Sequence, residues 1–270
     1  LKKYGISDAQ VECINFEFNA TFSVSTESGQ KYALRLNINS TRTVSNILAE
    51  TQWVRELARI PSVNVPTPIA TLDDQFVVSA LHEDSGQTIC GVMYSWLEGE
   101  EIGDEPTLDQ LRRVGQAIAH MHQNKSEFQL TDGAELPTFN DFFWGTEDFL
   151  FSVRSTLSPE DKTLIKQAHD LIMKFTNELY ATSPVRIIHA DFHGWNLMWH
   201  EDQVFIFDFD DCGFGVEAQD IAVALYWLNT PTADLTLLEG YRSVRPLPAY
   251  SDKAMKALLL QRRLLLLNYL

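Results

Sequence analysis

Apolar and polar residues alternate over the first part of the chain, which predicts strands rather than helices. The alternation covers "CINFEFNATFSVST" at 13–26 and "KYALRLNI" at 31–38, and the turn "ESGQ" separates the two. Because alternate side chains of a strand share a face, these segments predict a hairpin around the Ser-Gly turn. A second hairpin is predicted around Ser85-Gly86, within "QFVVSALHEDSGQTICGVMYSWLEG" at 75–99.

A helical periodicity marks one segment of this half of the chain and several segments of the other half. The first is "VSNILAETQWVRELARI" at 44–60, which Pro61 follows. Such a pattern predicts an amphipathic helix that ends before the proline. Thr107 is the predicted N-cap of one later helix, and another is predicted to start at Ser158-Pro159. The later helical segments are 107–124, 158–181 and 218–229.

The change from strands to helices predicts two domains, residues 1–97 and residues 98–270. The apolar ending "KALLLQRRLLLLNYL" predicts a core helix, interrupted by Gln261, Arg262 and Arg263. We expect the chain to continue beyond this ending. The predicted fold class is α+β, with an antiparallel sheet and one helix in the first domain and mainly helices in the second.

The charge balance narrows the possible partners. The 270 residues include 37 Asp and Glu but 21 Lys and Arg, a formal net charge of −16, so we expect no nucleic-acid partner. No apolar run is long enough to span a membrane, and we expect no membrane segment. The three cysteines, at 13, 90 and 212, are widely spaced, which favours a reducing compartment and a cytoplasmic location. The sequence leaves the oligomeric state open.

Two polar clusters in the second half carry the candidate chemistry. In "IIHADFHGWNLMW" at 187–199, Asp191 is followed five positions later by Asn196, and Asp208 comes twelve positions after Asn196. The residues between them predict a tight hairpin that holds Asn196 at one strand end and Asp208 at the other. An amide oxygen and a carboxylate suit Mg²⁺, which takes its other ligands from water and a substrate phosphate. Asp191 would then orient or deprotonate a hydroxyl nucleophile.

The same segment allows another interpretation. His189, Asp191 and His193 alternate, so on an extended backbone they would share one face and, with Asp208, form the ligand set of a metal-dependent hydrolase. In the favoured interpretation His189 hydrogen-bonds the loop, and His193 either does the same or faces the substrate.

These residues resemble a known family. "IIHADFHGWNLMW" followed by "FIFDFDDCGFGVEAQDIA" is similar to the aminoglycoside phosphotransferases, kinase-like enzymes that include choline and homoserine kinases. The resemblance implies a bilobal protein-kinase-like fold, with Asp191 as catalytic base and with Asn196 and Asp208 as Mg²⁺ ligands. It also implies that Asp220 stabilises the catalytic loop.

The N-terminal half resembles the family more loosely but in the same order. "KYALRL" resembles the strand of the phosphate-contacting cation, which falls on Arg35, and "AETQWVREL" resembles the helix whose glutamate, here Glu50, pairs with it. "NFEFNATFS" resembles the loop over the phosphates, with Asn19 at a position that the family often fills with Asn. "GVMYSWLEG" resembles the inter-lobe linker, whose backbone near Ser95 and Leu97 would contact adenine.

The resemblance implies an enzyme that moves the γ-phosphoryl of ATP, with Mg²⁺, to a hydroxyl of a small molecule. Residues 1–97 would bind the nucleotide, and residues 98–270 would carry catalysis and bind an aminoglycoside, amino sugar, amino alcohol or homoserine-like acceptor. Asp210 and Asp211 follow Asp208 closely, and whether either of them also binds the metal stays open. Acidic residues after the linker and in a later aromatic stretch favour a cationic acceptor; they are Glu98, Glu100, Glu101, Asp104, Asp141, Glu147 and Asp148.

Three other functions stay open at this point. A protein Ser/Thr kinase of the same fold is one, because the catalytic motif does not encode the acceptor. A nucleotide-binding regulatory module is another, because Arg35 stands where a lysine is commoner. The third is the metal-dependent hydrolase that would use His189, Asp191, His193 and Asp208.

Overall fold

A computed structural model describes residues 1–16, 19–123 and 128–268, and the chain forms two compact units. The first unit comprises Leu1–Glu100, Asn124–Leu136 and Met198–Asp210, and the second comprises Glu101–Gln123, Pro137–Leu197 and Asp211–Leu270. The division into continuous domains at residue 97 stays a prediction. The first unit takes in two later segments, and the second of these carries Asp208.

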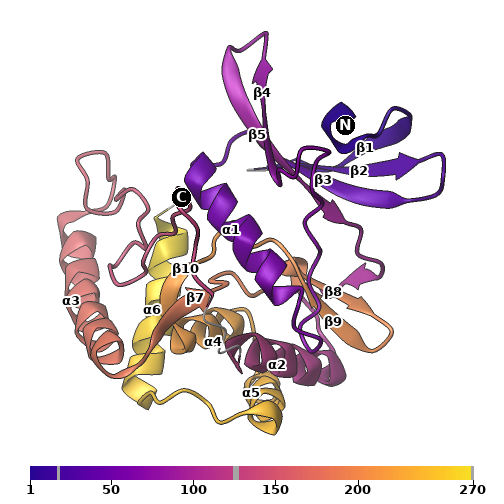
Figure 1. Ribbon diagram of the computed structural model, residues 1–270. Coiled ribbons are helices and arrows are strands. Elements are labelled where there is room, and N and C mark those ends of the chain that lie inside the picture. Colours follow the sequence, from indigo (N-terminus) through magenta and orange to yellow (C-terminus); the bar gives the residue numbers. More distant parts are fainter. Residues whose placement is uncertain (17–18, 124–127, 269–270) are drawn as a thin grey trace. The chain divides into compact units, whose positions relative to one another are not determined.

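The first unit contains a five-stranded antiparallel sheet and one long helix (Figure 1). Both predicted hairpins are confirmed, since Ser25 pairs with Lys31 and His82 pairs with Gln87 across the two turns. In spatial order the strands are β1 (Ala9–Phe16), β2 (Ala20–Thr26), β3 (Lys31–Asn37), β5 (Gln87–Ser95) and β4 (Val77–His82).

The alternating segment at 13–26 is two strands, not one. Phe16 at the end of β1 pairs with Ala20 at the start of β2, so the chain reverses within the segment. Residues 17–18 of the predicted strand lie outside the described part of the chain. The alternation continued across the reversal, and the prediction of a single strand was therefore wrong.

Helix α1 (Val44–Leu57) confirms the helix predicted in the first half of the chain. The Thr43 hydroxyl accepts from the Asn46 N–H, and the Asn46 side chain accepts from the Thr43 N–H, a reciprocal cap of the helix start. The helix buries Ile47 and Leu57 on the face that also presents Glu50. A carboxylate therefore lies among apolar side chains of the first unit.

The predicted hairpin between Asn196 and Asp208 is present. It consists of β8 (Leu197–His200) and β9 (Gln203–Ile206), which are neighbours in a three-stranded sheet with β6 (Glu100–Glu101). Glu201 and Asp202 form the turn with φ of 48° and 59°, the left-handed pair that a two-residue hairpin turn needs.

The second unit is mainly helical and contains α2 (Leu108–Gln123), α3 (Pro159–Thr182), α4 (Glu217–Tyr226), α5 (Pro231–Val244) and α6 (Asp252–Leu267). Thr107 caps α2 as predicted, and α3 begins at the predicted place, with Ser158 as its N-cap. Helix α2 packs against α5, and a Cβ at Gly115 would overlap the Leu237 carbonyl oxygen, so the glycine permits the close approach. Helix α6 packs against α3 and α4. The second unit also contains β7 (Val185–Ile188), which pairs with β10 (Gly213–Val216), and a short 3₁₀ turn, η2 (Gly194–Asn196), whereas a further 3₁₀ turn, η1 (Lys2–Tyr4), belongs to the first unit.

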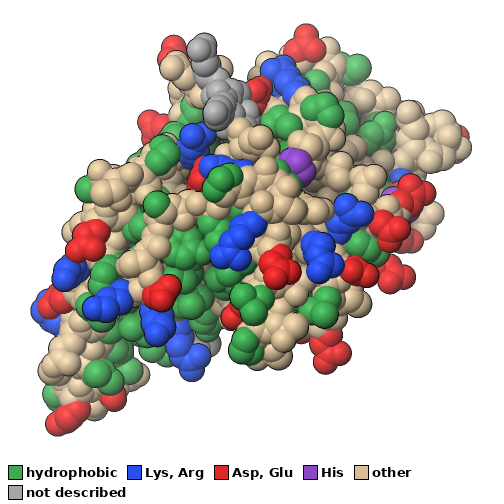
Figure 2. All heavy atoms as spheres, turned by 90° about the horizontal axis from the view of Figure 1, so that it is seen from below, with side chains coloured by type: hydrophobic (Ala, Val, Ile, Leu, Met, Phe, Trp, Pro, Cys, Tyr) green, Lys and Arg blue, Asp and Glu red, His purple; other side chains and the backbone are tan. Residues whose placement is uncertain are grey.

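Within the described ranges, no helix combines the length and apolar character needed to cross a membrane. Acidic and basic side chains are interspersed over the face drawn in Figure 2, rather than segregated into one large basic area.

Candidate active site

The segment between β7 and η2 is a loop whose shape is stabilised from beneath by Asp220. Asp220 is fully buried on α4 and accepts hydrogen bonds from the backbone N–H of His189 (3.1 Å) and of Ala190 (2.6 Å). Ala190 has φ 68°, a left-handed conformation that costs a residue with a Cβ about 1 kcal/mol or more. The two hydrogen bonds hold the backbone there, so the stabilising role expected of Asp220 is confirmed.

His122 on α2 extends this network. Its Nε2 lies 3.0 Å from Asp220 Oδ2, and its Nδ1 lies 3.0 Å from the Tyr241 hydroxyl. All three side chains are buried, and burial raises the pKa of Tyr241. The loop is thus tied to α2, α4 and α5 by polar contacts that water does not reach.

Asp191 is the residue that the loop presents. Its Oδ2 lies 3.2 Å from His193 Nε2 and accepts from Asn196 Nδ2 at 3.0 Å, while its Oδ1 accepts from the guanidinium of Arg262. Burial alone would raise the pKa of Asp191, but the hydrogen bond from His193 and the charge of Arg262 lower it to about 2. Asp191 is therefore an anion at neutral pH.

The loop histidines contact the loop itself. The Asp191 N–H donates to His189 Nδ1 at 3.2 Å, and the His189 ring stacks on Phe192 with 4.5 Å between centroids. His193 contacts Asp191 and also the Trp227 ring, at a centroid distance of 5.3 Å. Both histidines thus support the loop. Among the residues that the structure describes, no group of three or more His, Cys, Asp or Glu side chains is arranged to hold a metal ion.

Asn196 ends η2 directly before β8. Its Nδ2 donates both to the backbone oxygen of Asp191 and to the Asp191 carboxylate, each at 3.0 Å. Because the amide is planar, its oxygen points away from Asp191. An oxygen atom is the kind of ligand that Mg²⁺ prefers. Asp208 follows β9 with φ 58° and a side chain 46% exposed. Its carboxylate is of the same hard-oxygen type, so the chemistry of the two donors fits Mg²⁺.

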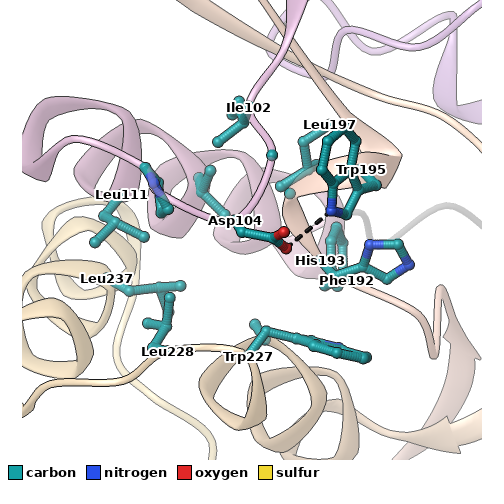
Figure 3. Close-up of a pocket in the computed structure, with 15 residues that line it drawn as sticks. Ile102, Asp104, Leu111, Phe192, His193, Trp195, Leu197, Trp227, Leu228 and Leu237 are labelled. Carbon is teal, nitrogen blue, oxygen red and sulfur yellow. Dashed lines mark hydrogen bonds between the residues drawn. The ribbon is translucent and has the colours of Figure 1, made fainter.

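A small cavity of about 40 Å³ lies beside the loop in the second unit (Figure 3). Trp195 and Trp227 contribute aromatic walls, and Asp104 points its carboxylate toward Trp195, whose Nε1 donates to Oδ1 at 2.8 Å. Gly194 accepts a backbone hydrogen bond from Gly103 at 3.0 Å, and a Cβ at Gly194 would overlap the Gly103 oxygen. The glycine therefore lets the loop lie against the wall of the cavity.

In the first unit, the predicted pair of Arg35 and Glu50 is formed. Arg35 NH2 donates to Glu50 Oε2 at 2.5 Å, and the Tyr94 hydroxyl donates to Glu50 Oε1 at 3.0 Å. Both charged side chains are nearly inaccessible, with 9% and 4% exposure. Burial alone would lower the pKa of Arg35, but the charge of Glu50 raises it well above its usual range. Arg35 Nε is buried and has no hydrogen-bond partner among the described residues, which leaves an N–H for an anionic ligand.

Asp210 joins the predicted phosphate-loop residue to this cation. Its carboxylate accepts from Asn19 Nδ2 (3.3 Å), from Asn37 Nδ2 (3.4 Å) and from the Ser40 hydroxyl (3.2 Å). Arg35 lies 3.8 Å from the Asp210 carboxylate and 3.9 Å from that of Asp208. Asp210 is thus surrounded by donors of the first unit, which favours a structural role over metal ligation.

The proposed adenine-contacting residues lie at and after the end of β5. The Ser95 N–H donates to the Thr67 oxygen, and the Ser95 hydroxyl accepts from the Thr67 N–H, each at 2.8 Å. These polar groups of Ser95 are therefore used within the chain. Leu97 is half-buried and lies after the end of β5, so the contact of this backbone with adenine stays a prediction.

The structure distributes the predicted site residues over both units. It brings Asp191 and Asn196 together in the second, while Asn19, Arg35, Glu50, Ser95, Leu97 and Asp208 lie in the first. Sequence reasoning did not assign a site role to Arg262, Tyr94 or Trp195. The only signal for Arg262 was the polar triplet at residues 261–263, within a run of leucines.

A loop aspartate beside an asparagine, a buried aspartate under the loop, and a strand cation paired with a helix glutamate are typical of kinase-like phosphotransferases. A model of the phosphotransferase enzyme family matches residues 17–251, and the chain belongs to this family. The resemblance inferred from the sequence is thereby confirmed.

Several known proteins are similar to the chain. Amicoumacin kinase of Bacillus subtilis (strain 168) is 26% identical over 226 residues, which cover 83% of this chain and 65% of that protein. The structure of a microcompartment-associated aminopropanol kinase matches with a TM-score of 0.81 at 24% identity, covering 99% of this chain and 86% of that one. An amicoumacin kinase in complex with AMP-PNP, Ca²⁺ and Ami matches with a TM-score of 0.78 at 22% identity, covering 96% and 80%.

These structural matches confirm the kinase-like fold. The chain spans less than two thirds of the length of the amicoumacin kinase from Bacillus subtilis.

Proposed function

We propose that the protein is a phosphotransferase that uses ATP and Mg²⁺ to phosphorylate a hydroxyl group of a small molecule. The observation that carries the proposal is Asp191, an anionic side chain oriented by His193, Asn196 and Arg262 on a loop that Asp220 stabilises. Family membership supports the same reaction class.

Asp191 would accept a hydrogen bond from the acceptor hydroxyl and align its oxygen with the γ-phosphorus. A carboxylate with a pKa of about 2 is a weak base, so it orients the hydroxyl and takes its proton only late in the transfer. This suits phosphoryl transfer, in which the loose transition state needs positioning and charge stabilisation more than proton abstraction.

The residues of the first unit would bind the nucleotide. Arg35, held by Glu50, would contact the phosphates, and Asn19, held by Asp210, would line the loop over them. The backbone around Leu97 would contact the adenine. Asn196 and Asp208 would hold Mg²⁺, which supplies charge neutralisation of the phosphates.

We further propose that the acceptor carries an amine. Asp104, Trp195 and Trp227 combine a carboxylate with two aromatic rings at the cavity beside His193, a set that suits a cation. The related proteins include an aminopropanol kinase, whose name agrees with an amino alcohol as acceptor.

The test is ADP release by the purified protein with Mg²⁺-ATP and a panel of amino alcohols, amino sugars, homoserine and choline. At least one acceptor should raise ADP release above the acceptor-free rate, and Asp191→Asn should reduce that increase to a small residual rate. A general base of this kind contributes roughly 100- to 10,000-fold to the rate. Equal rates for wild type and D191N with every acceptor would overturn the proposal, and phosphorylation of an added protein instead would favour the protein kinase.

Metal analysis of the purified protein distinguishes the kinase from the metal-dependent hydrolase. The kinase should be purified without stoichiometric zinc and should lose acceptor-dependent ADP release when EDTA removes Mg²⁺. Tightly bound zinc, with phosphate ester hydrolysis that survives D191N, would favour the hydrolase.

A further inference from the structure

Helix α6 contributes a side chain to the catalytic loop, although its sequence indicated only core packing. Arg262 NH2 donates to Asp191 Oδ1, and the two side chains are 11% and 17% exposed. The two residues are 71 positions apart in the chain. Their contact therefore depends on how α6 packs in the second unit.

The backbone of α6 is fixed on both sides of Arg262. The preceding residue, Gln261, is fully buried and donates to the backbone oxygens of Asp141 (3.2 Å) and Phe142 (3.1 Å). On the other side, Leu265 belongs to the same core cluster as Ala190 of the catalytic loop. Helix and loop thus share a core, and Arg262 reaches Asp191 from a rigid base.

The two oxygens of Asp191 are used differently. Oδ2 accepts hydrogen bonds from His193 and Asn196, which both belong to the loop itself. Oδ1 accepts a hydrogen bond from Arg262 on α6. A carboxylate oxygen accepts about two hydrogen bonds, so the pair from the loop fills Oδ2. Arg262 fills half of the capacity of Oδ1 and leaves one lone pair there for a further donor.

We propose that Arg262 is a positioning residue for phosphoryl transfer, which fixes the Asp191 carboxylate so that the acceptor hydroxyl donates to the remaining lone pair of Oδ1. This inference rests on the proposed kinase function. It assigns the acceptor hydroxyl to the side of Asp191 that faces Arg262, opposite to the side that Asn196 occupies.

The guanidinium group suits this role better than an ammonium group. It is planar and presents its N–H groups in fixed directions, whereas a lysine is a point charge on a flexible stem. The Trp227 ring lies 5.9 Å from the Arg262 guanidinium carbon and limits the space into which the side chain can turn. A small rotation of Asp191 would misalign the hydroxyl, and a misplacement of about 1 Å costs roughly 100-fold in rate.

The experiment compares kcat and KM of wild type, Arg262→Met and Arg262→Lys, with Arg263→Met as the matched control. Arg263 is the next residue of the same helix and is exposed. We expect R262M to lower kcat by roughly 100-fold with an acceptor KM within about threefold of wild type, R262K to recover part of kcat, and R263M to behave as wild type. Thermal unfolding of each variant checks that α6 is still packed.

A double-mutant cycle shows whether Arg262 acts through Asp191. In the D191N background, R262M should lower the residual rate by less than about threefold, because the group that it positions is already lost. An equal fold loss in both backgrounds would overturn the positioning role, as would an R262M kcat equal to that of R263M. A raised acceptor KM at unchanged kcat would make Arg262 an acceptor-binding residue instead.

The same measurements distinguish failure of the proposed kinase activity from failure of the role of Arg262. A wild-type protein without acceptor-dependent ADP release overturns the proposed kinase activity and the role of Arg262 with it. An active wild type whose R262M variant is equally active overturns the role of Arg262 alone.

Discussion

The catalytic loop of the second unit and the cation pair of the first unit are both built from buried polar groups, but they are stabilised in different ways. Beneath the loop, the Asp220 carboxylate binds two backbone N–H groups and a histidine. Around the cation, Arg35 and Glu50 bind each other, and Tyr94 adds a hydroxyl. The loop therefore depends on backbone hydrogen bonds, whereas the cation depends chiefly on one hydrogen-bonded carboxylate, Glu50, with those of Asp208 and Asp210 3.9 and 3.8 Å away.

This difference has energetic consequences. Backbone N–H groups are present whatever the side chains are, so Asp220 satisfies donors that the chain must satisfy in any case. In a buried ion pair, by contrast, both charges lose their hydration, and mainly their mutual attraction offsets that cost. Stability should therefore respond more strongly to loss of one member of the ion pair than to loss of one hydrogen bond beneath the loop.

The largest effect is expected for Glu50→Ala, which leaves the Arg35 guanidinium buried without its carboxylate. Removing one partner of such a pair costs about 3–5 kcal/mol of unfolding free energy. The measurement is urea denaturation followed by far-UV circular dichroism. The double variant Arg35→Met with Glu50→Gln removes both charges, keeps an acceptor for Tyr94, and should recover most of the loss. If the double variant is as unstable as E50A, the cost lies in packing and not in the unpaired charge.

A smaller loss of stability and a clear loss of activity are expected for Asp220→Asn. Asparagine keeps one acceptor oxygen but turns an NH₂ group toward the backbone donors of His189 and Ala190, which costs about 1–3 kcal/mol. The loop should then shift, and kcat should fall while the KM for ATP stays near that of wild type. Asp234→Asn, a half-buried aspartate on α5, is the control and should change neither quantity. Unchanged kcat in D220N would mean that the loop holds its shape without Asp220.

The sequence predicted the parts of this site that depend on short separations along the chain. Asp191, Asn196 and Asp208 lie on either side of one hairpin, so spacing and turn chemistry were enough to identify them as candidates. The hairpins and helices followed from periodicity for the same reason. One alternation that continued across a chain reversal hid the division of β1 from β2.

Contacts made over long separations were not predictable in this way. Arg262 contacts Asp191 only because α6 packs against the core of the second unit, and its sequence shows just a polar triplet, residues 261–263, between leucines. Asp210 was left as a possible metal ligand, because nothing local indicates that Asn19, Asn37 and Ser40 surround it. The sequence pattern shows which polar residues interrupt an apolar segment, but their partners depend on tertiary packing.

Two matched hydroxyl deletions, Tyr94→Phe and Tyr241→Phe, test the same comparison at single hydrogen bonds, and Y241F should have the smallest effect. Tyr94 donates to the charged Glu50, whereas Tyr241 lies 3.0 Å from His122, which in turn contacts Asp220. A hydrogen bond to a carboxylate is worth about 1.5–3 kcal/mol, above the roughly 1 kcal/mol of an average hydrogen bond, so Y94F should destabilise more than Y241F in urea denaturation. Y94F should also weaken ATP binding, since Arg35 depends on Glu50, while Y241F should leave it unchanged. Equal losses of stability would mean that a hydrogen bond of the His122 network stabilises the fold as much as one of the ion pair, and the contrast between the two regions would not hold.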